Sequence, residues 1–83
     1  MQIEEIKRLI EAGLKGSQVE VDGDGTHFNA VIVSDAFTGK SPVQQHQLVY
    51  RALGDKMGGD IHALSMQTYT PDEWARKKEL KTL

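Results

Sequence analysis

Two copies of one helix-start signal divide the second half of the chain and limit how it can fold. In Ser41-Pro42-Val43-Gln44, and again in Thr70-Pro71-Asp72-Glu73, a hydroxyl residue precedes a proline and a Gln or Glu follows. The hydroxyl can cap the first amides of a helix, the Gln or Glu can bond back to the cap, and proline suits the first turn. The sequence therefore predicts helices that begin at Ser41 and Thr70.

The second of these boundaries carries an additional signal. Tyr69 precedes the cap and Trp74 occupies the fourth helical position, so the two rings can pack together as a hydrophobic staple. We therefore expect Ser41, Thr70 and Trp74 to have structural roles.

Helical and strand patterns alternate along the rest of the chain. Apolar residues at helical spacing predict a first helix closed by Gly16: Ile3, Ile6, Ile10 and Leu14. Alternating apolar residues around an Asp-Gly turn predict a β-hairpin over 18–34, in which Phe28, Ala30 and Ile32 share one face. A third strand is expected over 61–69.

The helix that begins at Ser41 carries one apolar stripe at helical spacing: Val43, His46, Tyr50, Leu53 and Met57. Gly54 weakens its last turn or splits off a short extra helix, and Gly58 and Gly59 end it. A packed imidazole is more common than a ligand in such a stripe, so we expect His46 to be structural and to help build the core.

These elements predict a single α+β domain over 1–83 in the order αββαβα, with fraying expected in the basic tail 76–83. The connection between the second and third strands is a helical crossover of the length that parallel pairing requires. We therefore expect a three-stranded mixed sheet with the helices packed on one face.

Composition excludes several classes of function. The chain has no cysteine, which excludes disulfides, thiol nucleophiles and self-sufficient zinc-finger or iron-sulfur sites. Its formal net charge of −2 argues against general nucleic-acid binding. There is no apolar run of the ~20 residues that span a membrane and no signal peptide, so a soluble cytoplasmic protein is expected. Nothing beyond two histidines suggests catalysis, so we do not expect an enzyme.

Those two histidines begin neighbouring strands. Parallel strands start at the same end of a sheet, so His27 and His62 are expected at one edge, beside the turn 22–26. Strand alternation directs His27 away from the core and puts His62 on the face of Leu64 and Met66. Paired metal ligands and two ordinary strand-end histidines both remain open.

The last helix concentrates four basic residues: Arg76, Lys77, Lys78 and Lys81. They form a candidate phosphate-contacting patch, whereas the alternative is a solvated helix face that complements the helix dipole. The acidic turn beside His27 would repel phosphate.

The segments FTGKSPVQQHQLVYRAL and IHALSMQTYTPDEWA, together with the αββαβα order, resemble the BolA-like proteins, most closely their bacterial IbaG (YrbA) branch. The resemblance extends over nearly the whole chain and includes a characteristic spacing of Phe37, Gly39, His46, Val49, Tyr50, His62, Thr70, Pro71 and Trp74. It implies a class II KH-like fold.

The resemblance also implies a partner and a cofactor. BolA-like proteins associate with monothiol glutaredoxins and share a [2Fe-2S] cluster held in part by glutathione, in iron-sulfur trafficking or iron, redox and stress regulation. The family's most constant ligand matches His62, and a second ligand from the first hairpin has His27 as its only candidate here. The family's helix-two histidine matches His46, but Gln45 and Gln47 replace its usual arginine neighbours.

The KH-like fold implies an alternative function as a nucleic-acid-binding transcriptional regulator, which would use the basic tail. A homodimer is open, as is whether the protein stores, delivers or senses clusters. No cluster is expected in the isolated chain.

Overall fold

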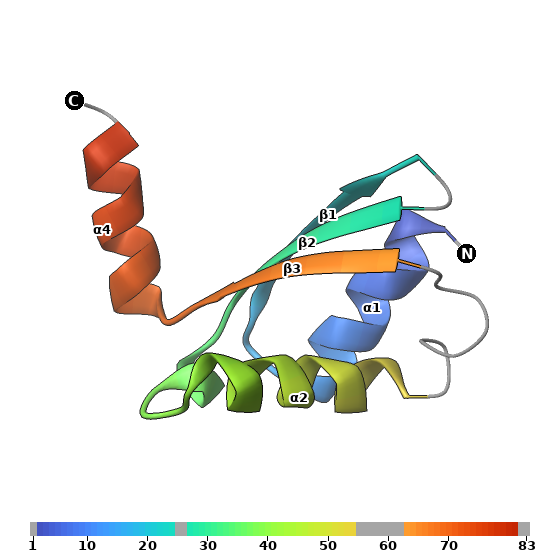
Figure 1. The fold of residues 1–83 in the computed structure, drawn as a ribbon, viewed down its shortest axis with the longest axis horizontal. Helices are drawn as coiled ribbons and strands as arrows, with labels where there is room; N and C mark the ends of the chain where they lie inside the picture. The colour runs from blue at the N-terminus through green and yellow to red at the C-terminus, as the bar shows by residue number, and fades with distance from the viewer. Residues whose placement is uncertain (1, 25–26, 55–62, 82–83) are drawn as a thin grey trace.

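The computed structural model describes residues 2–24, 27–54 and 63–81. Its elements follow the predicted order (Figure 1): α1 (Ile3–Gly13), β1 (Gln18–Gly23), β2 (His27–Val33), a 3-10 turn η1 (Asp35–Phe37), α2 (Pro42–Leu53), β3 (Ala63–Tyr69) and α4 (Pro71–Lys81). In the sheet β2 is central, antiparallel to β1 and parallel to β3. The predicted α+β fold with a mixed three-stranded sheet is confirmed.

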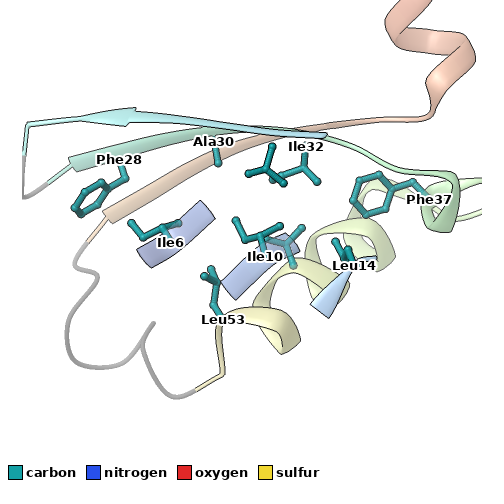
Figure 2. Close-up of a cluster of buried hydrophobic side chains, with 10 residues drawn as sticks. Ile6, Ile10, Leu14, Phe28, Ala30, Ile32, Phe37 and Leu53 are labelled. Atoms are coloured by element: carbon teal, nitrogen blue, oxygen red, sulfur yellow. The ribbon is translucent and has the colours of Figure 1, made fainter. Parts of the chain in front are cut away.

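The core lies between one face of the sheet and the helices α1 and α2 (Figure 2). Phe28, Ala30 and Ile32 of β2 point from the sheet toward Ile6 and Ile10 of α1, and all five are buried. Phe37 of η1 and Leu53 of α2 close the same cluster. The strand alternation and the spacing of the first helix therefore predicted the correct buried faces.

The first two helices approach each other closely at their ends. A Cβ atom on Gly13 would collide with the Cβ of Ala52 and come within 2.9 Å of its Cα. The α1 helix ends at this glycine, and Gly16, with φ 81°, lies in the turn that follows. The helix is thus shorter than predicted. Gly13 permits the close contact with α2, and Gly16 turns the chain into β1 instead of closing the helix.

The second helix begins and ends at identifiable residues. The amide of Ser41 donates to Gln44 Oε1 and the amide of Gln44 donates to Ser41 Oγ, so the predicted capping box is formed. Gly54, with φ 60°, caps the other end and its amide donates to Tyr50. Met57, Gly58 and Gly59 of the predicted continuation lie outside the described residues.

The last helix begins with one connecting residue after β3. Thr70 and Glu73 exchange the two hydrogen bonds of a capping box, at 2.9 and 3.3 Å, and the Tyr69 and Trp74 rings pack with centroids 5.3 Å apart. Both predictions for this boundary are confirmed. The helix extends to Lys81 and projects beyond the end of β3, so among the described helices it is α1 and α2 that cover the core face (Figure 1). Such a short connection gives the chain no length to turn back under the sheet.

Glu73 makes the start of α4 sensitive to acid. Hydrogen bonds from the Thr70 amide and side chain, and to a lesser extent the charge of Arg76, lower the pKa of Glu73 below the ordinary 4.5, against an opposing desolvation. A carboxyl whose pKa is lowered by folding stabilises the folded state above its unfolded pKa, and this stabilisation is lost as pH falls through the folded pKa. We therefore expect the Thr70 amide proton to titrate with a midpoint below 4.5 in an NMR pH series.

Glu73→Gln provides the matched control, since glutamine can accept the same hydrogen bond without titrating and serves in the same position at Ser41. In this variant the Thr70 amide should keep its shift through the acidic range. A wild-type midpoint at or above 4.5 would contradict the proposed stabilisation of the carboxylate.

Candidate functional site

His27 is the first residue of β2 and its backbone is fixed by the hairpin turn. Its amide donates to Asp24 Oδ1 at 2.9 Å, and the amide of Asp24 donates to the His27 carbonyl oxygen at 3.1 Å. A Cβ on Gly23 would collide with that carbonyl oxygen, so this close turn requires glycine. The exposed His27 side chain is therefore carried on a well-defined backbone.

The parallel pairing of β2 and β3 relates the two predicted histidines. In the register of these strands His27 is opposite Ala63, which directly follows His62 in the sequence. His62 itself lies outside the described residues. The prediction that β2 and β3 are parallel and start at the same end of the sheet is confirmed for the described residues, from the His27–Ala63 pair onward.

The two faces of the sheet differ in chemistry around His27. Leu64 and Met66 pack against the core cluster, whereas His27 is exposed on the opposite face, next to the polar pair formed by Asn29 Nδ2 and Asp22 Oδ1 at 3.1 Å. In the part of the chain that the structure describes, no group of three or more His, Cys, Asp or Glu side chains is placed to hold a metal ion. His27 can thus contribute one imidazole from an acidic, solvent-accessible edge.

The predicted basic patch on α4 is only partly described. Arg76 is exposed, but Lys77 is half-buried and its Nζ donates to the Tyr69 hydroxyl at 2.6 Å. That hydroxyl donates in turn to Gln67 Oε1 at 2.8 Å. The side chains of Lys78 and Lys81 lie outside the described residues. Lys77 therefore ties α4 to β3, and the described half of the patch presents one exposed cation, Arg76.

The prediction that His46 helps to build the core is wrong. His46 is half-buried and does not belong to the core cluster, while Val43 and Tyr50 of the same predicted stripe are exposed. Leu53 of the predicted stripe is buried as expected, but the other buried residues of α2 are Gln45 and Val49. Residues 45, 49 and 53 also recur at helical spacing, but the series begins with a glutamine, which an apolar pattern does not select.

Gln45 is the structural residue that the sequence pattern missed. Its Nε2 donates to the carbonyl oxygens of Phe37 at 3.2 Å and Lys40 at 2.9 Å, and its Oε1 accepts from Thr68 Oγ1 at 2.6 Å. One buried amide therefore joins α2, the η1 loop and β3. The Phe37 oxygen also accepts from the Lys40 amide at 3.1 Å, so Gln45 adds a second bond there.

Among the described residues, no helix combines the length and apolar character that a membrane span requires.

Comparison with known proteins gives a consistent family. The family model described as BolA-like protein matches residues 8–73. The chain is 40% identical over 81 residues to the acid stress protein IbaG of Escherichia coli K12, covering 96% of both proteins.

A human relative and a solved structure agree with this match. The chain is 42% identical over 67 residues to BolA-like protein 1 of Homo sapiens, covering 81% of this chain but 49% of that protein, so it spans about half the length of the human relative. The structure of a bolA protein homologue from Coxiella burnetii superposes with a TM-score of 0.84 at 49% identity, covering 92% of this chain and 99% of the other.

Proposed function

The chain belongs to the BolA-like family, and from this premise we propose that it is the partner of a monothiol glutaredoxin and shares a [2Fe-2S] cluster with it. Its role would be to relay or regulate iron-sulfur clusters, or to act in iron, redox or stress regulation, by binding rather than by catalysis. The cysteine-free composition suits this role, because the thiolate ligands would come from glutaredoxin and glutathione and the imidazole ligands from this chain.

His62 is the proposed first ligand and His27 the second. The observation that supports the pair is the parallel register, in which His27 is opposite the residue that follows His62. The Asp24 turn supports His27 by holding its backbone while the side chain remains exposed. Mixed thiolate and imidazole ligation would raise the reduction potential of the cluster and make it sensitive to protonation near neutral pH.

Reconstitution tests this function directly. The chain is mixed with a monothiol glutaredoxin, glutathione, iron and sulfide without oxygen, and separated by size-exclusion chromatography. We expect a coloured heterodimer whose visible circular dichroism differs from that of the glutaredoxin cluster alone, because imidazole replaces thiolate at one iron. Colour that elutes only with the glutaredoxin homodimer would contradict the proposal.

A further inference from the structure

The outer face of α2 exposes apolar side chains that the core does not use. Val43 is 67% exposed and Tyr50 43% exposed, and they are the large hydrophobic side chains most open to solvent among the described residues. They are separated by two helical turns, about 10 Å along the axis, and the exposed Gln47 lies between them on the same side. Together Val43, Gln47 and Tyr50 form a continuous stripe, here called the outer stripe.

Positive charge flanks the outer stripe and negative charge is absent from its segment. The sequence from Gly39 to Leu53 contains Lys40 and Arg51 but no Asp or Glu, in a chain whose net charge is −2. A shallow groove of about 190 Å³ runs beside the stripe, with Leu48 in its lining and Lys40 and Arg51 contributing its cations. Both cations are exposed.

This arrangement fits a particular kind of surface. Apolar side chains would cover Val43 and Tyr50, while carboxylates about three turns apart on a facing helix would meet Lys40 and Arg51. We propose that the outer face of α2 docks an acidic amphipathic helix of a partner protein. None of these residues is a proposed cluster ligand.

Two other occupants fit less well. A second copy of this chain could offer α1, but its exposed side mixes Glu4, Glu5 and Glu11 with Lys7 and Arg8, so only part of its charge is complementary to Lys40 and Arg51. A nucleic acid would need more than two cations to neutralise its phosphates and gains little from an aliphatic Val43. Charge complementarity therefore favours an acidic protein helix.

A designed peptide provides the probe. It is an 18-residue helix-forming peptide with leucines at positions facing the outer stripe and glutamates at both ends of that face, and a second peptide replaces those glutamates by lysines. Binding to the full chain is followed by fluorescence anisotropy and by NMR shifts. We expect saturable binding of the glutamate peptide that shifts α2 resonances and weakens as salt increases.

Paired variants separate the contributions. Val43→Ser with Tyr50→Ser should weaken binding at least tenfold because the apolar contact is lost. Lys40→Glu with Arg51→Glu should weaken binding of the glutamate peptide by roughly fivefold and strengthen binding of the lysine peptide. Lys7→Glu, an exposed charge in a groove lined by α1, the sheet and Trp74, should leave both unchanged. All altered side chains are exposed, and far-ultraviolet circular dichroism will verify that each variant folds.

Several results would overturn the proposal. These are no saturable binding up to millimolar peptide, equal binding of the lysine peptide, absence of the charge-swap effect, or α2 shifts caused by a DNA duplex and not by the glutamate peptide. Self-association of the chain that disappears in the Val43→Ser and Tyr50→Ser variant would also overturn it, by identifying a second copy as the occupant.

Discussion

Replacing His62 by alanine is expected to abolish the cluster that we propose the chain shares with a glutaredoxin. The methyl group of alanine cannot coordinate iron, and the cysteine-free chain has no thiolate to substitute. The visible absorption and circular dichroism of the reconstituted heterodimer should therefore disappear or revert to those of the glutaredoxin cluster, with a matching loss of bound iron. His27→Ala should alter the same spectrum, since it removes the proposed second ligand.

His46→Ala is the matched control for these substitutions. It removes the third histidine of the chain. His46 is half-buried on α2 and is not a proposed ligand. His46→Ala should leave the spectrum unchanged. His62→Cys supplies a second readout, because thiolate ligation should lower the reduction potential of the cluster. If His62→Ala retains the wild-type spectrum and iron content, His62 is not a ligand.

Local chemistry explains which parts of the fold were predictable. The helix starts at Ser41 and Thr70 depend on hydrogen bonds between residues three apart, and both sets of bonds are formed as predicted. The hairpin and the parallel register follow from strand periodicity and from the length of the crossover, which leave few alternative arrangements. Interactions of this kind are contained in short stretches of sequence.

Tertiary choices were harder to predict. The α2 helix has two apolar series that both include Leu53, one through Val43 and Tyr50 and one through Val49, and periodicity alone does not determine which faces the sheet. Lys77 was grouped with the basic tail, but its hydrogen bond to Tyr69 depends on where α4 meets β3. The two proposed ligands, His27 and His62, were also only partly predictable. The length of the crossover predicts that their strands start at the same end of the sheet, whereas only the family resemblance implies that they bind a cluster.

The choice of buried face on α2 depends on Gln45, and this makes Gln45→Ala the strongest test of the fold. The substitution would remove both hydrogen bonds to the carbonyl oxygens of Phe37 and Lys40, take the acceptor from Thr68, and leave a cavity. The lost hydrogen bonds and the truncated buried side chain together should lower the free energy of unfolding by about 2–4 kcal/mol. Urea denaturation followed by far-ultraviolet circular dichroism measures this change.

Gln47→Ala is the matched control, because it makes the same chemical change two residues further along α2 at an exposed position. Its effect should stay within about 0.5 kcal/mol. Gln45→Leu separates packing from hydrogen bonding, since leucine restores most of the volume but cannot satisfy the two carbonyl groups. If Gln45→Leu is as stable as the wild type, packing alone accounts for the position. A Gln45→Ala loss no larger than that of Gln47→Ala would show that the amide does not hold the η1 loop, α2 and β3 together.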